Sequence, residues 1–347
     1  MSLNVLILDE GSPGHRTQSE GVMQLLERQG VCIQVETVRL QNILPGIFRG
    51  LMRGVLTVPL KSLNEKCLLI VSRLDTQPAR RPDLIISSGG KSAFASLVLK
   101  RRYRAHNIFV GVPAPFPDRW FDLVVSPVER PFKSPYVVSG LIPNTVTRQK
   151  VLAAGKDYWK SEPPPTPCWT LLVGGDSKSH HYSLDDWSKL AEGINNLGQS
   201  LGIRWLITTS RRTPAEVETL LAEALDRNVV AELVLYNRSP KRVVQPFLAV
   251  SERVLVTQDS LTMASEALCS GSPVTLLAPE ELEVPAESFF ANMLQYFAQL
   301  DGVERIPMAR LPSYRPTCMV DKSVMTLDQL GPELISALKA IGVPCDS

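Results

Sequence analysis

The chain has 347 residues and a formal net charge of +2, because 37 lysines and arginines face 35 acidic residues. This length allows two domains with separate cores, and 44% hydrophobic with 21% charged residues is typical of a folded, soluble protein. The charge balance argues against nucleic acid as a partner, and no apolar run reaches the roughly 18 to 20 residues that span a bilayer.

The cysteines indicate a reducing, cytoplasmic setting. None has C-x-x-C spacing, and no secretory signal precedes the first expected strand. The six cysteines are Cys32, Cys67, Cys168, Cys269, Cys318 and Cys345. We therefore expect no disulfide framework. No D-x-D motif or His/Cys cluster indicates a metal, so we expect no essential metal, and we expect no cofactor.

The first half alternates apolar strands with amphipathic helices. The pattern predicts strands at 4–8, 31–38, 84–86, 108–112, 123–126 and 136–139, and helices at 17–29, 94–100 and 147–159. The stretch SEPPPTP then marks a linker, because proline cannot continue a helix or a central strand. We place the domain boundary there, between 1–160 and 161–347.

The second half repeats the alternation. Strands are expected at 169–173, 204–208, 234–236, 254–257 and 273–277, and helices at 184–201, 214–225, 240–250, 263–269, 286–299 and 326–341. Both halves therefore have the pattern of an α/β domain built on its own sheet.

One turn in the second half favours an anionic ligand. Val254 to Thr257 is a buried strand, and Asp259 and Ser260 supply helix-starting side chains. A helix that begins above the carboxyl edge of a parallel sheet points its amides at the usual place for phosphate. Glu266 lies beyond this turn and does not fit a capping box, so it is either a favourable charge near the helix start or an acceptor for ribose hydroxyls.

Glycine-containing loops follow three of the expected strands. They are Gly11-Ser12-Pro13-Gly14-His15, Ser88-Gly89-Gly90-Lys91 and Gly174-Gly175-Asp176-Ser177. Each alone is typical of an ordinary strand–helix turn, and none is a Walker loop or a complete G-x-G-x-x-G. Together with the turn at Ser260 they indicate a cleft, because strand-end loops of two α/β domains can converge.

Several basic and imidazole side chains have two possible roles, one structural and one functional. His15 either bonds locally in its loop or acts as a general base on a hydroxyl acceptor. His180 and His181 follow the second-domain loop and could contact phosphate. The segment 47–61, with Arg49 and Arg53, is either irregular core or a surface that touches lipid headgroups.

These motifs, in this order, resemble the mitochondrial fission protein family of plants and its bacterial relatives, whose members look like GT-B glycosyltransferases. The resemblance rests on LDEGSPGHRTQSEG, FDLVVSP, VSGLIPNTVT, LLVGGDSKSHHYS and VTQDSLTMASEALCSGSPV. The chain departs from the family at Glu10, an extra acidic residue, and at Val128-Glu129-Arg130-Pro131. The resemblance implies a fold of two Rossmann-like domains that face an interdomain cleft, with the last helix crossing back onto the first domain.

A more distant similarity links the chain to the membrane-associated enzyme that adds N-acetylglucosamine to the lipid-linked cell-wall precursor. It implies that His15 borders the acceptor and that Glu266 holds the ribose. It further implies an acceptor side and a nucleotide side. The acceptor side is Gly11, Gly14, Ser88, Gly89, Gly90 and Lys91, and the nucleotide side is Gly174, Gly175, Asp176, Ser177, Ser260, Leu261 and Thr262.

The sequence thus predicts a metal-independent glycosyltransferase that moves a sugar from a nucleoside diphosphate to an envelope-associated, lipid-linked acceptor. Peripheral contact with the inner membrane is part of this expectation. The alternatives are a non-catalytic GT-B-like scaffold that recruits proteins to a membrane and, third, a nucleotide-sugar epimerase. An NAD-dependent epimerase needs a dinucleotide fingerprint that the loop GSPGH lacks.

Overall fold

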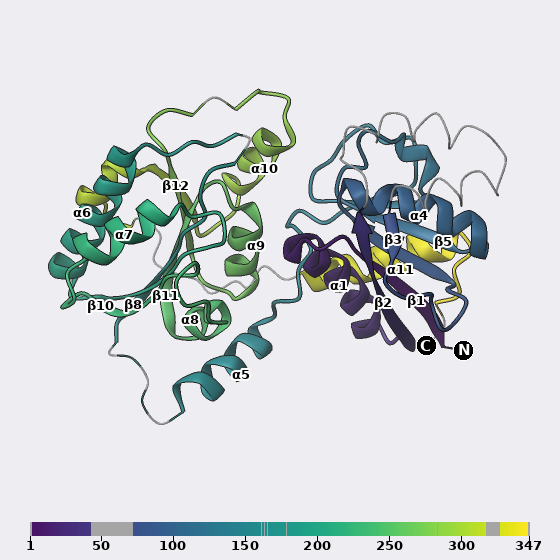
Figure 1. Ribbon diagram of the computed structural model, residues 1–347, viewed down its shortest axis with the longest axis horizontal. Helices are drawn as coiled ribbons and strands as arrows, with labels where there is room; N and C mark the ends of the chain where they lie inside the picture. The colour runs from purple at the N-terminus through teal and green to yellow at the C-terminus, as the bar shows by residue number, and fades with distance from the viewer. Residues whose placement is uncertain are drawn as a thin grey trace. The chain divides into compact units, whose positions relative to one another are not determined.

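The structure is a computed structural model that describes residues 2–42, 72–160, 162, 164, 166–177, 179–282, 284–316 and 327–345. The chain forms two compact units (Figure 1). The first unit is Met1–Thr145 with Leu327–Ser347, and the second is Val146–Thr326. The segment 47–61, for which we expected either core or lipid contact, lies outside the described residues.

The first unit is built on a seven-stranded sheet with the order β3-β2-β1-β4-β5-β6-β7. All neighbours are parallel except β2 and β3. Its strands are β1 (Leu3–Asp9), β2 (Ile33–Asn42), β3 (Ser72–Leu74), β4 (Leu84–Ser88), β5 (His106–Val110), β6 (Leu123–Ser126) and β7 (Tyr136–Val138). Its helices are α1 (Pro13–Arg28), α4 (Gly90–Tyr103) and α11 (Leu330–Ala340), with short turns η2 (Asp118–Trp120) and η4 (Leu327–Gln329).

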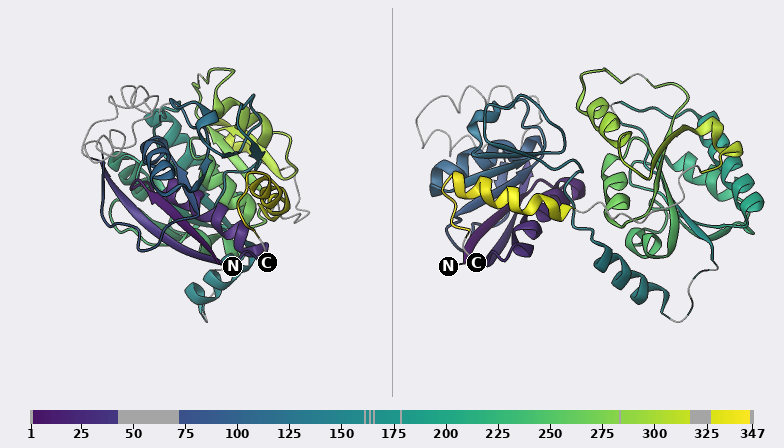
Figure 2. Two further views of the ribbon diagram at one scale, coloured as in Figure 1. Left: turned by 90° about the vertical axis from the view of Figure 1, so that its right-hand side faces the viewer. Right: turned by 180° about the vertical axis from the view of Figure 1, so that it is seen from behind.

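The final helix α11 belongs to this first unit. It packs against α1 and β7 (Figure 2). Leu334 and Leu338 are buried on its inner face, and Arg28 at the end of α1 forms an ion pair with Asp328 at 2.9 Å. The C-terminal segment thus completes a domain whose sheet is formed by the N-terminal part of the chain.

The second unit is a six-stranded parallel sheet with the order β10-β9-β8-β11-β12-β13. Helices α6 and α7 lie on one face of this sheet, and α8 and α9 on the other (Figure 1). The strands are β8 (Cys168–Leu172), β9 (Arg204–Thr208), β10 (Val230–Val234), β11 (Ser251–Thr257), β12 (Val274–Ala278) and β13 (Val303–Pro307). The helices are α5 (Arg148–Trp159), α6 (Leu184–Leu201), α7 (Ala215–Ala224), α8 (Val244–Val250), α9 (Leu261–Cys269), α10 (Phe289–Phe297) and the turn η3 (Met308–Ser313).

Each sheet has one point where the strand order reverses. In the first unit the chain winds outward from β1 in one direction and from β4 in the other, and in the second unit it does so from β8 and β11. Loops at the carboxyl ends of such strand pairs diverge and leave a crevice, where α/β proteins bind ligands. The expected glycine loops follow β1, β4 and β8, and the turn at Ser260 follows β11.

Several expected boundaries were wrong. Helix α1 begins at Pro13 rather than Thr17, because proline suits the first helical position, where its missing N–H costs nothing. The strand expected at 234–236 is Val230–Val234, where it pairs with β9, and β13 was not expected. The division falls after Thr145 rather than after residue 160, because α5 packs on α8 and Trp159 stacks on Phe247 with ring centroids 6.2 Å apart.

Candidate functional site

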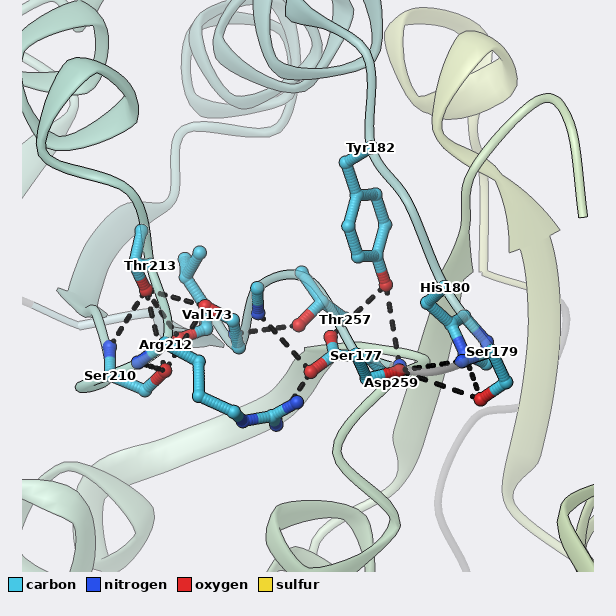
Figure 3. A network of polar contacts seen from close by, with 12 residues as sticks. Val173, Ser177, Ser179, His180, Tyr182, Ser210, Arg212, Thr213, Thr257 and Asp259 are labelled. Atoms are coloured by element: carbon cyan, nitrogen blue, oxygen red, sulfur yellow. Dashed lines mark hydrogen bonds and ion pairs between the residues drawn. The ribbon is translucent and has the colours of Figure 1, made fainter.

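The buried carboxylate of Asp259 joins the loops at the strand-order reversal of the second unit (Figure 3). Its Oδ2 accepts the Gly175 N–H at 3.1 Å and lies 2.6 Å from Nη2 of Arg212, in the loop after β9. Its Oδ1 accepts the hydroxyl of Tyr182 at 3.1 Å. Burial raises the pKa of Asp259, although Arg212 acts in the opposite direction.

The two glycines of the first loop are needed for packing between loops. A Cβ on Gly174 would lie 2.2 Å from Oδ2 of Asp259, and one on Gly175 would lie 2.2 Å from the carbonyl oxygen of Arg212. Gly174 also donates its N–H to Oγ1 of Thr257 at 2.7 Å. The chain itself fills the space beside these two glycines.

The rest of the first loop folds back on itself. Asp176 accepts the backbone N–H of Tyr182 at 3.2 Å, and Ser177 donates its N–H to the carbonyl of His180 at 2.9 Å. Asp176 remains half exposed and lies 3.6 Å from His181, whose side chain is 79% exposed. The side chain of Asp176 and the backbone N–H of Ser177 therefore hold the loop in shape through hydrogen bonds within it.

His180 is fully buried and its tautomer is defined by its neighbours. Its Nε2 lies 3.1 Å from the side-chain nitrogen of Gln258, whose oxygen accepts from Arg305. Its Nδ1 lies 3.0 Å from Oγ of Ser179. Because the Gln258 nitrogen donates, Nε2 is the acceptor and Nδ1 carries the proton. Burial lowers the pKa of His180 to about 4, with Arg212 adding to the shift, so this ring is a neutral structural group rather than a cation for phosphate.

The turn before α9 leaves a different set of amides open from the one that the sequence suggested. Ser260 donates its N–H to the carbonyl of Thr257 at 3.1 Å, so that amide is occupied. Ser260 is the N-cap of α9, and its side chain makes no capping bond. The first-turn amides of Leu261, Thr262 and Met263 have no acceptor within the helix, so they are the ones that can face an anion.

Glu266 lies one helical turn beyond Thr262, on the same side of α9. Among the described residues no side chain or backbone group makes a hydrogen bond or ion pair with its carboxyl group. Burial raises the pKa of Glu266 to about 7. Burying a carboxyl group without a partner costs folding free energy, and a carboxyl with a perturbed pKa at such a position is a candidate for a ligand site.

In the first unit, the loops after β1 and β4 bring His15, Gly89 and Lys91 together at the strand-order reversal. His15 lies in the first turn of α1, and its Nδ1 is 2.6 Å from Oε1 of Glu10. We expected Lys91 to lie on the side of the site that binds the acceptor substrate. The backbone N–H of Lys91, in the first turn of α4, instead donates a hydrogen bond to the carboxylate of Glu10. Glu10, the residue that departs from the family pattern, therefore occupies a backbone N–H group of the expected acceptor-binding side.

The other acceptor-side residues have local roles. Gly11 has a φ of +84°, which favours glycine, and donates its N–H to Asp9 at 2.7 Å. Gly14 is the second residue of α1 and Gly90 the first of α4. Ser88 donates its hydroxyl to Gln18 at 2.7 Å.

The sequence did not identify Arg212, Tyr182 or the central role of Asp259. Asp259 was recognised only as a helix-starting residue, and its partners lie in loops far away along the chain. The one available signal was the polar run Thr209-Ser210-Arg211-Arg212-Thr213 directly after a buried strand. In the part of the chain that the structure describes, no three His, Cys, Asp or Glu side chains group as a metal site, and no helix is long and apolar enough to cross a membrane.

Comparison with solved structures shows the fold. A Listeria monocytogenes protein described as a UDP-N-acetylglucosamine 2-epimerase has a TM-score of 0.56 at 14% identity, over 99% of this chain and 92% of that one. S. aureus MnaA with UDP has a TM-score of 0.51 at 13% identity, over 96% and 88%. Medicago truncatula UGT71G1 with UDP-glucose has 0.51 at 10% identity, over 98% of each chain. The fold is GT-B-like with two Rossmann-like domains, which confirms the predicted class.

Sequence comparison shows the family. An uncharacterised protein of Rickettsia prowazekii (strain Madrid E), RP120, is 25% identical over 274 residues, which cover 68% of this chain and 76% of the Rickettsia protein. The model of the family described as "Mitochondrial fission ELM1" matches residues 13–316. The chain therefore belongs to the mitochondrial fission ELM1 family, as its motifs predicted.

Proposed function

We propose that the protein binds a nucleoside-diphosphate sugar at the carboxyl ends of β8 and β11 and transfers the sugar to an acceptor. The observation that carries this proposal is the pair formed by the open first turn of α9 and Glu266 one turn further on. An anion-binding helix start followed by a carboxyl without a partner has the two contacts that a nucleotide's phosphate and ribose require.

The diphosphate would bind to the amides of Leu261 and Thr262. Arg212 adds a positive charge at the same loops, because its guanidinium is 36% exposed while Asp259 holds one of its nitrogens. Amides and a guanidinium fixed in advance stabilise the charge that develops on a leaving diphosphate. The loop at Gly174 to Ser177 contributes by positioning Asp259 and Arg212.

The ribose would be held by Glu266. An ionised carboxylate accepts two hydrogen bonds, and the two ribose hydroxyls are donors. The fold neighbours from S. aureus and Medicago truncatula, which were solved with UDP and UDP-glucose, support a nucleotide ligand for this fold. UDP-sugars are therefore the first donors to test.

In the transfer step, the acceptor hydroxyl oxygen forms a bond to the anomeric carbon of the sugar. The bond from that carbon to the diphosphate oxygen breaks, and the nucleoside diphosphate leaves with the electron pair. The hydroxyl proton passes to a base, for which we propose His15. An acceptor-activating histidine and a preorganised diphosphate site together describe a glycosyltransferase without a metal.

A pocket in the first unit favours an acceptor with an apolar part and an anionic group, as a lipid-linked acceptor has. It measures about 330 Å³ and is formed by the loops after β5 and β6, at the same sheet edge as His15. Phe116 and Phe132 line it together with Arg119 and Arg130. No described residue forms an ion pair with either arginine, so both guanidinium groups are available to an anion.

Epimerisation is the second candidate, because the Listeria fold neighbour is described as a UDP-N-acetylglucosamine 2-epimerase. The missing dinucleotide fingerprint argues only against an epimerase that uses NAD. The products separate the two reactions, since transfer releases a nucleoside diphosphate whereas epimerisation yields a nucleotide sugar of unchanged mass.

Thermal unfolding with UDP-, GDP-, ADP- and CMP-sugars tests the binding proposal. A ligand at 100 times its Kd stabilises the folded protein by about 2.7 kcal/mol. We expect one nucleotide class to raise Tm, and Glu266→Gln to abolish most of the rise. Glu223→Gln, at an exposed position on α7, is the matched control and should keep it.

Two results would contradict the proposal. If no nucleotide sugar raises Tm, the result favours the alternative of a GT-B-like scaffold that recruits proteins. If Glu266→Gln and Glu223→Gln bind the donor equally well, the ribose lies elsewhere.

A further inference from the structure

The carboxylate of Glu10 links His15 to the start of α4. Its Oε1 is 2.6 Å from Nδ1 of His15, and its Oε2 accepts the backbone N–H groups of Lys91 at 2.8 Å and Ser92 at 3.0 Å. The Glu10 side chain is only 6% exposed, whereas that of His15 is 39% exposed. The acid is thus fixed inside the loops and the imidazole lies at their surface.

Glu10 acts as the cap that α4 lacks in its own sequence. The N-cap of α4 is Gly89, which has no side chain to offer, and the first turn contains no acidic residue. The amides of Lys91 and Ser92 are the second and third of the helix, which are the groups a capping side chain normally satisfies. A carboxylate from the loop after β1 therefore takes the position that an anionic ligand would otherwise occupy at this helix start.

Gly89 makes the room for this pair. Its φ is +93°, and a Cβ there would lie 2.4 Å from Oε1 of Glu10 and 2.4 Å from Nδ1 of His15. Burial alone would raise the pKa of Glu10, but the bonds from His15, Ser92 and Lys91 outweigh burial, so that the pKa falls below its usual value. Glu10 is therefore ionised at neutral pH.

An ionised carboxylate only accepts hydrogen bonds, so Nδ1 of His15 must carry a proton. In the neutral imidazole this leaves Nε2 without one. Asp9, Arg16 and Lys91 are further charged residues at the end of β1 and in the first turns of α1 and α4. Asp9 faces Arg16 at 3.7 Å, Arg16 bonds Glu20 at 2.7 Å, and the side chain of Lys91 is exposed.

We infer that Glu10 is a positioning residue for His15: it fixes the tautomer protonated on Nδ1 and presents Nε2 as the proton-accepting atom. The helix start of α4 holds Glu10 in place for this purpose and is closed to a ligand's phosphate. The inference about the tautomer stands on geometry alone, whereas its use in catalysis rests on the proposed function.

Glu10→Gln tests the inference, because it changes charge and bonding while keeping shape. The amides of Lys91 and Ser92 need an acceptor, so the glutamine oxygen must turn toward α4. Its NH₂ group then faces Nδ1 of His15, which must become the acceptor. We expect the histidine to change from the Nδ1–H to the Nε2–H tautomer.

Long-range ¹H–¹⁵N NMR correlations at pH 8 distinguish the two tautomers. The chain has four histidines, so His15→Gln assigns the signal. Glu20→Gln is the control. Glu20 lies in the same helix as His15 but accepts a hydrogen bond from Arg16, so this change should leave the His15 tautomer as it is. The backbone signals of Lys91 and Ser92 report whether the variant still folds at this site.

An Nε2–H tautomer in the unmodified protein, or an Nδ1–H tautomer in Glu10→Gln, would overturn the inference. Where a donor and acceptor are in hand, Glu10→Gln should lower kcat about 10²-fold or more with little change in the donor KM. If the tautomer changes and kcat does not, the positioning role stands and the proposed base role of His15 fails.

Discussion

Nη2 of Arg212 lies 2.6 Å from Oδ2 of Asp259, a carboxylate that is fully buried while the arginine is 36% exposed. The same oxygen accepts the N–H of Gly175. The ion pair and this hydrogen bond therefore join the loops after β8, β9 and β11. A substitution of Arg212 or Asp259 should for this reason alter the conformation of all three loops.

Arg212→Gln and Asp259→Asn should each lower the free energy of unfolding of the second unit by about 1–3 kcal/mol, because each leaves a buried polar group with an unsuitable partner. The double variant should cost less than the sum, since the second change removes the group that the first one stranded. Arg211→Gln, at the exposed neighbouring arginine, is the control.

Urea unfolding followed by tryptophan fluorescence suits this measurement, because four of the five tryptophans lie in the second unit. Costs of the single variants that add up to within about 0.5 kcal/mol would show that the pair is not coupled.

Glu266 should destabilise the second unit at neutral and higher pH. Its pKa rises from 4.5 to about 7 on folding, so the fold prefers the protonated acid. The stabilising effect of that proton is complete below pH 4.5 and is lost as the pH rises through 7. Glu266→Gln should therefore raise the free energy of unfolding at pH 8, by up to about 3 kcal/mol, and change it little at pH 4.5.

Equal stability of Glu266→Gln and the unmodified protein at pH 8 would mean that the carboxyl group finds a partner in solution. A gain in stability together with a loss of donor binding is the pattern expected for a side chain kept for a ligand.

His180 should act in the opposite direction over nearly the same pH range. Its pKa falls from 6.5 to about 4 on folding, so its contribution is complete above pH 6.5 and is lost as the pH falls toward 4. In the unmodified protein this slope and that of Glu266 largely offset each other. In His180→Gln the effect of Glu266 remains, so the free energy of unfolding should fall as the pH rises. In Glu266→Gln the effect of His180 remains, so the free energy of unfolding should increase as the pH rises.

The measurement is the urea midpoint of each variant at several values between pH 4 and pH 8. If both variants have the same pH dependence as the unmodified protein, neither group changes its protonation on folding.

Gly89→Ala should disturb the Glu10–His15 pair. The new Cβ would have to displace both side chains and would sit at a φ of +93°, so we expect a loss of about 1–3 kcal/mol and faster amide exchange at the start of α4. Gly14→Ala is a suitable contrast, because nothing lies within 4 Å of its Cβ and it is helical. That change should be neutral or stabilise by up to about 1 kcal/mol. Similar exchange rates in both variants would contradict the close packing at Gly89.

The sequence predicted most elements, because they follow from local periodicity, and it located the strand-end loops, because these follow from the order of strands and helices. It could not predict which side chains meet. Glu10 and Lys91 are 81 residues apart and Tyr182 and Asp259 are 77 apart, so their contacts depend on strand order rather than on spacing. Glu10 was for this reason read only as a departure from the family pattern.

Which backbone N–H groups at the start of α9 are open to a ligand could not be predicted from the sequence either. Ser260 to Thr262 was recognised as a helix start, but whether an amide is open depends on the turn before it. The bond from Ser260 to Thr257 removes one of the three. Turn geometry of this kind is not encoded in the identity of a single residue.

Helix α11 has a consequence for the order in which the protein is made. Its buried leucines, and Asp328 that pairs with Arg28, belong to the first unit, although they are synthesised after the whole of the second. On the ribosome, the second unit has all of its residues available before the first unit does. A nascent chain that stops near residue 316 should therefore expose the α11-binding surface of α1 and β7, where a chaperone can bind until synthesis is complete.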